Sequence, residues 1–176
     1  MNNYKYLFKA IFFFIFLPFV VLTSFYTSQT DTQLELEVYN YEEITNKQRQ
    51  LECLTKNVYY EAGTEPFEGK LAVAQVTINR ARNENFPSDI CDVVSQKSYI
   101  KSKLVCQFSW YCNNEFRNRP INFDKYQESR EAAVRVFLDE KDYKTVGDSL
   151  FFHADYINPN WKRPKVVTIG HHIFYR

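Results

Sequence analysis

The sequence lacks the signatures of several common classes of functional site. Its 22 basic and 21 acidic side chains leave a net charge of +1, so no basic excess predicts binding to nucleic acid. It contains no CxxC pair and no HExxH helix, which argues against zinc, and we predict no metal and no cofactor. No Gly-x-Ser-x-Gly elbow surrounds Ser109, which argues against a hydrolase triad with His153. With no internal repeats, 176 residues suit one compact domain and a short appendage.

One uncharged apolar run lies near the N-terminus. It covers residues 10–22 and extends through Tyr26 to about the shortest length that crosses a bilayer. Lys5 and Lys9 precede it and only acidic residues follow closely, which predicts that the C-terminal body lies outside the cytoplasm. Because no Ala-x-Ala cleavage pattern follows, we favour an uncleaved anchor at residues 1–26 over a signal peptide. The predicted location is the inner (cytoplasmic) membrane, single-pass with the domain in the periplasm, or secreted if the segment is cleaved.

Beyond the apolar run, the sequence predicts a polar tether at residues 27–48 and one domain at residues 49–176. Apolar residues at helical spacing predict a first helix ending near Ala62, and a second helix between Pro66 and about Asn83. Since Gly63 is a natural helix stop and Pro66 suits a first turn, the two helices should meet at a corner.

The rest of the domain is predicted from caps, spacing and turn residues. Ser88 should cap a short helix through Val94, and residues 97–122 read as a long loop. Asp124 should cap a third main helix, whose buried face comprises Ala133, Val134, Phe137 and Leu138. Residues 149–153 and 165–175 are β-rich and flank a turn at residues 158–160, which predicts a small antiparallel sheet at the C-terminal end. The expected fold class is α+β, mainly helical, with a short C-terminal sheet.

Four cysteines form an even set in a domain that we expect to be exported. An oxidising compartment lets such cysteines pair. Three complete connectivities are open, and Cys106 with Cys112 would close a short loop around Phe108 to Trp110. The set comprises Cys53, Cys91, Cys106 and Cys112.

Glu61 is the leading candidate for catalysis. It sits at the expected corner, after Tyr59 and Tyr60 and before Ala62-Gly63, which is an apolar, close-packed setting. Such surroundings raise the pKa of a carboxylic acid and keep its proton available near neutral pH. Glu65 and Glu68 need no such role, because acidic residues at the start of a helix complement its dipole.

The stretch around Glu61 resembles a known family. Residues 61–66 read Glu-Ala-Gly-Thr-Glu-Pro, where the cell-wall hydrolases of the SleB/CwlJ type have Glu-Ala-Arg-Gly-Glu-Pro. Phe86-Pro87, Cys106-Gln107-Phe108-Ser109 and residues 168–175 follow in family order, so the resemblance covers roughly residues 49–176. It implies a lysozyme- or transglycosylase-like domain that acts on the glycan strands of peptidoglycan, with Glu61 matching the catalytic glutamate.

The family's lytic transglycosylase activity implies a route that needs only one carboxylate. The C6 hydroxyl of N-acetylmuramic acid attacks its own anomeric carbon to give a 1,6-anhydro product, while one glutamate acts first as acid and then as base. Hydrolysis by water, of the glucosaminidase type, stays open, with Glu65 or Glu68 as the second carboxylate. An N-acetylmuramoyl amidase is another alternative, although no zinc motif or activated nucleophile is visible. A third is a non-catalytic peptidoglycan-binding module, since Gly63-Thr64 departs from the family's Arg-Gly.

Five further residues are candidates for contact with the glycan, because flat rings suit sugar faces and amides or hydroxyls suit sugar oxygens. Core packing is the alternative for the aromatic members, and a structural hydrogen bond is the alternative for the histidine. His171 and His172 alternate along a predicted strand, so they should point to opposite faces. The five candidates are Gln107, Phe108, Ser109, Trp110 and His153.

Overall fold

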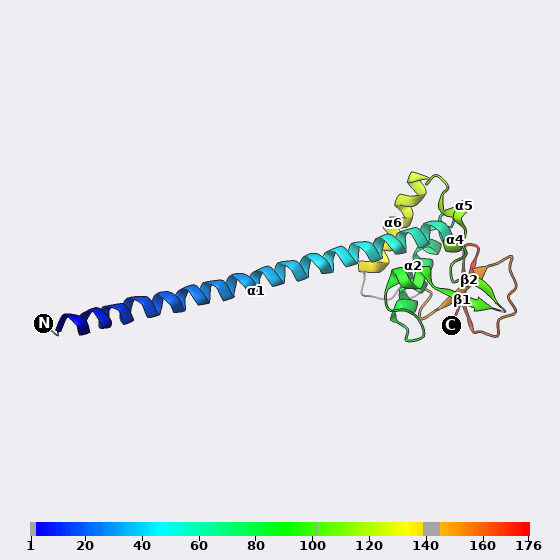
Figure 1. Cartoon of the computed structure of the whole chain (residues 1–176). Helices are drawn as coiled ribbons and strands as arrows, with labels where there is room; N and C mark the ends of the chain where they lie inside the picture. Colours follow the sequence, from blue (N-terminus) through cyan, green and yellow to red (C-terminus); the bar gives the residue numbers. More distant parts are fainter. Residues whose placement is uncertain (1–2, 101, 139–144) are drawn as a thin grey trace. The chain divides into compact units, whose positions relative to one another are not determined.

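The computed structural model describes residues 3–100, 102–138 and 145–176, and only the backbone of residues 3–24, 27, 28, 30 and 100. The chain divides into two compact units, Met1–Asn46 and Lys47–Arg176. Helix α1 runs from Asn3 to Ala62 and so belongs to both (Figure 1). The second unit contains all the other helices and strands that are described.

The first unit is helical where a polar tether was expected. Residues 31–46 lie in α1 with their side chains exposed, including the apolar Leu34, Val38 and Ile44. The predicted anchor falls mostly on residues 1–24, whose side chains lie outside this description. Among the residues that are described, no helix combines the length and the apolar composition that a bilayer span requires.

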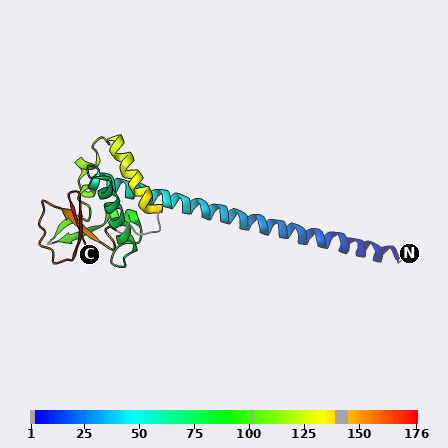
Figure 2. The ribbon, with the colours of Figure 1, turned by 180° about the vertical axis from the view of Figure 1, so that it is seen from behind.

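Helix α2 (Phe67–Arg82) is the central helix of the second unit. It follows α1 after a short corner, as the sequence predicts. The expected apolar stripe through Leu71, Ala74 and Ile78 is buried, but so are most residues on the other faces of α2. Helix α6 (Phe123–Leu138) packs along α2, and both lie at the same end of the unit in Figures 1 and 2. Burial on all sides explains the run of small and apolar residues between Leu71 and Ile78.

Two predicted helix caps are wrong by one or two residues. Helix α3 (Ile90–Ser95) is capped by Asp89 rather than Ser88, because the Asp89 carboxylate accepts from two backbone N–H groups of the first turn. At the start of α6, the Asn122 side chain accepts from the Lys125 N–H at 3.0 Å, where Asp124 was expected to cap. In both cases a neighbouring polar side chain has the correct reach.

The buried face of α6 also differs from the expected one. Its fully buried residues are Ser129, Ala132, Ala133 and Val136, while Val134 and Phe137 are half-buried. Leu138 is 69% exposed, contrary to the prediction. The observed set keeps the spacing of three and four residues, but it selects small side chains because α6 lies close against α2.

The expected long loop at residues 97–122 is structured instead. Strands β1 (Lys97–Ile100) and β2 (Lys103–Cys106) form an antiparallel hairpin. The short helices α4 (Ser109–Cys112) and α5 (Asn114–Arg117) follow. These elements are only four residues long and largely polar, so no periodic pattern marks them in the sequence.

The C-terminal strands form the predicted small antiparallel sheet. Strands β3 (Phe151–Ala154), β4 (Lys165–Ile169) and β5 (His172–Tyr175) lie in the order β3-β5-β4. Gly170 turns the chain between β4 and β5 with a positive φ of 55°, a conformation that suits glycine. Phe174 points from β5 into the core and is fully buried.

Two disulfides settle the open pairing of the four cysteines. Cys53 of α1 is bonded to Cys91 of α3, and Cys106 of β2 is bonded to Cys112 of α4. The first joins segments 38 residues apart, whereas the second closes a loop of a few residues.

Candidate functional site

The corner between α1 and α2 places Glu61 at the last turn of α1. The Gly63 N–H donates to the Tyr59 carbonyl at 3.0 Å and ends the helix. A Cβ atom at position 63 would overlap that carbonyl oxygen, so this backbone requires glycine there. Pro66 then stands immediately before the first residue of α2. The corner is the one that the sequence predicts.

Glu61 faces a cavity of about 810 Å³. The cavity lies between the corner, the segment 106–110, the C-terminal sheet and the loop after β3. Among the described residues that line it, Glu61 is the only carboxylate. The lining also includes all five of the predicted glycan-contact residues: Gln107, Phe108, Ser109, Trp110 and His153.

The charge state of Glu61 is set by burial and by one cation. Burial raises the pKa of Glu61 to about 7, and the positive charge of Arg80 acts in the opposite direction. Burial also lowers the pKa of Arg80 to about 10, while the negative charge of Glu61 raises it. Near neutral pH, Glu61 is therefore divided between its protonated and ionised forms, beside a fixed positive charge.

Arg80 is held in place on several sides. Its Nε donates to the Leu150 carbonyl at 2.7 Å, and its guanidinium lies 4.9 Å from the centre of the Phe108 ring. In the amide orientation that satisfies both groups, the Gln107 side-chain oxygen accepts from Nη1 and Nη2 at 3.1 Å. Arg80 was not a predicted site residue. Its sequence signal is weak, because Asn79 and Arg82 beside it make Arg80 look like part of a polar helix end.

The segment from Cys106 to Trp110 alternates between the core and the cavity mouth. Phe108 and Trp110 are 2% and 7% exposed, while Gln107 and Ser109 are exposed. Core packing therefore describes the two aromatic rings, which form the floor of the cavity. The two polar side chains stand at its open side, where a ligand can reach them.

An aromatic wall continues from this floor to the corner. The rings of Tyr60 and Trp110 stack at 4.4 Å, and Phe116 lies beside Tyr60 at 6.5 Å. The Trp110 indole N–H donates to the Asn57 side chain at 2.9 Å, which fixes the orientation of the ring. Tyr60 and Phe116 were not predicted as site residues, and an aromatic content of 18% gives such sequence signals little selectivity.

The three histidines occupy different environments. His153 lies with Nδ1 2.8 Å from the Ala154 carbonyl and Nε2 3.0 Å from the Tyr175 hydroxyl, so both ring nitrogens have partners within the protein. Its contact with substrate stays a prediction. His171 is exposed beside Asp155, with Nδ1 and Oδ2 3.1 Å apart, whereas His172 is buried, and burial lowers its pKa. The two neighbours thus face apart.

The other two glutamates near the corner do not line the cavity. The Glu65 Oε2 atom accepts from the backbone N–H of His171 at 2.8 Å, which ties the corner to the turn before β5. Glu68 is exposed in the first turn of α2. Neither is placed to act as a second carboxylate opposite Glu61. Within the described ranges, no cluster of three or more acidic, histidine or cysteine side chains has the geometry of a metal site.

Comparison with known proteins gives a consistent result. Residues 64–175 match a family model described as Cell Wall Hydrolase, and the match begins just after Glu61. Spore cortex-lytic enzymes from Oceanobacillus iheyensis and Bacillus subtilis are 28% and 26% identical over 134 and 131 residues. These alignments cover 72% and 70% of this chain but 41% and 36% of the relatives, so the chain spans less than half of their length.

Two solved structures share the fold. One is the catalytic domain of the Bacillus cereus SleB protein, with a TM-score of 0.57 and 23% identity over 73% of this chain and 91% of that chain. The other is the catalytic domain of the germination-specific lytic transglycosylase SleB from Bacillus anthracis, with a TM-score of 0.56 and 23% identity. It covers 73% of this chain and 95% of that chain. At this identity the likeness establishes a mainly helical fold with a small antiparallel sheet.

Proposed function

This chain belongs to the Cell Wall Hydrolase family, and from that premise we propose that it cleaves the glycan strands of peptidoglycan with Glu61 as the proton donor. The observation that carries the proposal is the position of Glu61, as the only carboxylate among the described residues lining a cavity of about 810 Å³. Its pKa of about 7 keeps a proton available at neutral pH, which a general acid needs.

The proposed reaction is that of a lytic transglycosylase. Glu61 gives its proton to the glycosidic oxygen as the bond from that oxygen to the anomeric carbon of N-acetylmuramic acid breaks. The C6 hydroxyl oxygen of the same sugar then bonds to the anomeric carbon, and its proton returns to the Glu61 carboxylate. The products are a 1,6-anhydro end and a free hydroxyl, and Glu61 is regenerated without a second carboxylate.

Arg80 supports this cycle through its charge. Glu61 is ionised between the two proton transfers, and a carboxylate in a buried site is unfavourable without a nearby cation. Arg80 supplies that cation from α2, where the Leu150 carbonyl fixes it. The positive charge thus comes from the neighbouring helix rather than from position 63, where related sequences have arginine and where this backbone requires glycine.

The test is digestion of purified sacculi followed by mass analysis of the products. We expect anhydro-muropeptides from the native chain and none from Glu61→Gln, which keeps the shape of the side chain but has no acidic proton. Glu68→Gln is the matched control, because Glu68 is exposed outside the cavity, and it should cleave normally. Both variants should still bind sacculi.

Other outcomes of the same digestion would overturn the proposal. Reducing ends without anhydro products would indicate hydrolysis by water, and release of free peptides would indicate an amidase. Sacculus binding without any product from the native chain would indicate a non-catalytic wall-binding module.

We also propose a membrane-anchored arrangement, with an anchor at residues 1–26, a tether at 27–48 and the catalytic domain at 49–176. The support is the uncharged run at residues 10–22, preceded by Lys5 and Lys9. The two disulfides further support an oxidising compartment such as the periplasm. The inner membrane and the peptidoglycan strands are then the two partners of the chain.

A further inference from the structure

A second cavity, of about 670 Å³, lies on the outer face of the C-terminal sheet. His153 of β3 is paired with Ile173 of β5, and both line this cavity together with Tyr175. Their neighbours Phe152 and Phe174 point to the other face, where Phe174 is fully buried in the core. The second cavity is therefore separated from the core by the sheet itself.

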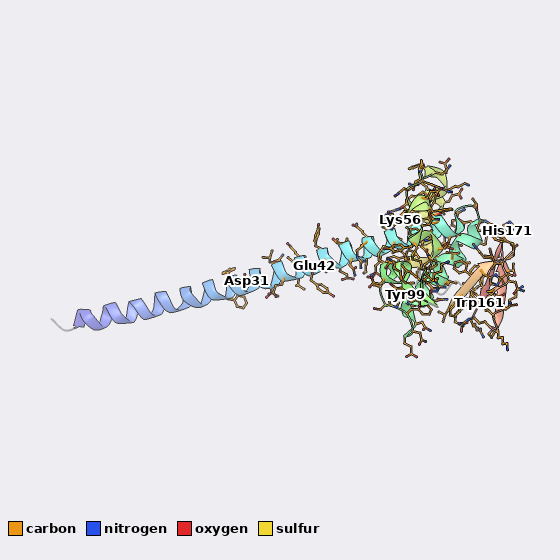
Figure 3. The ribbon with its side chains drawn as sticks, turned by 45° about the vertical axis from the view of Figure 1, so that its right-hand side comes forward. Asp31, Glu42, Lys56, Tyr99, Trp161 and His171 are labelled. Carbon is orange, nitrogen blue, oxygen red and sulfur yellow. A yellow bond between two sulfur atoms is a disulfide. The ribbon has the colours of Figure 1, made fainter. Side chains whose placement is uncertain are left out.

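The loop between β3 and β4 lies between the two cavities. Residues 155–164 form this loop, and four residues line both cavities: His153, Ile157, Pro159 and Trp161. The Trp161 ring makes edge contacts with His153 at 5.4 Å and with Tyr175 at 5.8 Å, and the residue is 40% exposed. Figure 3 shows Trp161 in the part of the domain that carries this sheet. The two cavities are thus neighbours on either side of this loop, with Trp161 in the lining of both.

Charged side chains of both signs line each of the two cavities. The second cavity contains the charged side chains of Asp155 and Lys162 together with the amides of Asn158 and Asn160. Asp155 is paired with His171. Lys162 is exposed, and no hydrogen bond or ion pair is found for it in the part of the chain that the structure describes. Arg163, which lines the first cavity, and Lys165 follow Lys162 closely in the sequence.

The sugars of a glycan strand do not account for the positive charge of Lys162 in the lining of the second cavity. The sugar rings of the strand carry no ionised groups, so a lysine gains little from a further sugar. The short peptide that branches from the lactyl group of N-acetylmuramic acid carries carboxylates and amides, which suit a lysine and asparagine side chains. It also branches beside the bond that is cleaved, so a site for it must adjoin the site for the sugar.

We propose that the second cavity binds the peptide stem of the muramic acid whose glycosidic bond lies at Glu61, with Lys162 facing a stem carboxylate. The proposal rests on the proposed function for its substrate. It assigns the substrate class as glycan strands that still carry their peptides. Trp161 stands at the branch point, where the sugar and the peptide part.

The experiment measures binding, so that it does not depend on turnover. Full-length Glu61→Gln protein is titrated with two sets of glycan strands of matched length. One set keeps its stems; in the other an amidase has removed the stems, and the lactyl carboxylates that this exposes have been converted to neutral methylamides. We expect at least about fivefold tighter binding of the strands with stems, the size of one exposed charge pair and its hydrogen bonds. Equal affinity for the two sets would overturn the proposal.

Substitution of Lys162 locates the effect. In the same Glu61→Gln background, Lys162→Met should remove most of the preference for strands with stems and leave the affinity for stripped strands unchanged. Lys162→Glu should reduce the binding of strands with stems further. Lys125→Met, on the exposed side of α6, is the matched control and should change neither affinity. An equal loss on both kinds of strand, or no loss on either, would assign Lys162 no role in stem recognition.

The two proposals fail in different ways. If the native chain releases no product from sacculi but the Glu61→Gln protein still prefers strands with stems, the cleavage reaction is refuted and the peptide site stands. If the native chain cleaves strands with stems and stripped strands equally well and binds them equally, the reaction stands and the peptide site is refuted.

Discussion

Glu61 and Arg80 are oppositely charged when ionised, and burial acts on the pKa of each. Each is more stable ionised when the other is present, yet burial acts against both charges. For Glu61 burial is the larger of the two effects, and the attraction of Arg80 is the smaller. The result is a carboxyl group whose pKa of about 7 lies at the working pH of a general acid.

The first prediction concerns the dependence of activity on pH. The donating form of Glu61 is the protonated one, so kcat/KM should fall as the pH rises through about 7. Arg80→Met removes a charge that lowers the pKa of Glu61, so the fall should move to higher pH. Arg80→Lys keeps the charge and should leave the fall closer to its native position. A profile that fell at the same pH in the native protein and in Arg80→Met would contradict this account.

The second prediction compares two glycines with positive φ. Gly147 has a φ of 51° and nothing within 4 Å of the position that a Cβ would occupy, whereas a Cβ at Gly170 would overlap the Glu65 carboxylate. Gly147→Ala should lower the free energy of unfolding by about 1 kcal/mol, from backbone strain alone. Gly170→Ala should lower it by about 1 to 2 kcal/mol more, because Glu65 must leave the His171 N–H. Denaturant titration measures both.

A double substitution is the control for the second prediction. In Glu65→Ala the overlapping carboxylate is gone and the Pro66 Cδ atom, 3.0 Å from the Cβ position, stays close, so adding Gly170→Ala should then cost only slightly more than Gly147→Ala does. If Gly170→Ala lowers the free energy of unfolding equally with and without the Glu65 side chain, the hydrogen bond from His171 to Glu65 does not contribute to stability.

At the scale of elements, the central position of α2 organises the domain. Thr77 accepts from Asn57 of α1 at 3.0 Å, and Asn57 in turn accepts from the Trp110 indole. Lys70 donates to the Glu65 carbonyl at 2.8 Å and to the Glu128 carboxylate of α6 at 3.0 Å. Since unpaired polar groups in a core are costly, these bonds specify how α1, α4 and α6 pack around α2.

The third prediction separates the roles of the two disulfides. Cys106–Cys112 joins residues 6 positions apart, and Cys53–Cys91 joins residues 38 positions apart. Because each bond reduces the entropy of the unfolded chain, it should raise the free energy of unfolding, by about 2 kcal/mol for Cys106–Cys112 and by about 4 kcal/mol for Cys53–Cys91. Replacing Cys106 and Cys112 by serine should therefore cost less stability. It should cost more activity, because this bond closes the segment with Phe108 and Trp110 that forms the cavity floor.

The Cys53→Ser, Cys91→Ser double variant is the matched comparison, since neither residue lines the cavity. Thermal unfolding and sacculus digestion on both double variants, at a temperature where each is folded, measure the two effects. Activity lost in proportion to stability in both variants would contradict a specific role for the Cys106–Cys112 loop.

At the scale of the whole molecule, the chain combines a folded unit, Lys47–Arg176, with a helical N-terminal unit, Met1–Asn46. The folded unit contains the cavity, the corner and both disulfides. The N-terminal unit contains the uncharged apolar run, and none of its residues is among the described ones that line the cavity. The proposed membrane attachment therefore concerns the N-terminal unit and the proposed cleavage concerns the folded unit.

The fourth prediction tests that attachment. If the proposed anchor is correct, the full-length chain should sediment with the inner membrane and stay there after an alkaline carbonate wash, because an anchor of about 13 to 17 uncharged residues would be buried in lipid. Arginine in place of Ile15 should release it, since a charge within the bilayer is costly. Recovery of the unprocessed native chain in the soluble fraction would contradict the anchor, and a shortened soluble form would indicate cleavage.

The order of the main helices, the corner at Glu61 and the C-terminal sheet could all be predicted from the sequence. These features rest on local signals: apolar residues at helical spacing, Gly63 and Pro66 at the corner, and β-rich runs around a turn. The exact caps failed at Ser88 and Asp124 because several polar neighbours compete for one set of N–H groups. The hairpin and short helices of residues 97–122 carry no periodic signal and were missed.

The fold adds to the cavity residues that the sequence did not single out, such as Arg80, Tyr60 and Phe116. Glu61 and Arg80 come from different helices, and the loop with Trp161 approaches from the far end of the chain. Contacts between distant segments also determine three other features. These are the pairing of Cys53 with Cys91, the position of Glu65 outside the cavity and the second cavity on the sheet. Local sequence restricts the backbone, but burial and charge depend on what packs nearby in space, and these set the chemistry of Glu61.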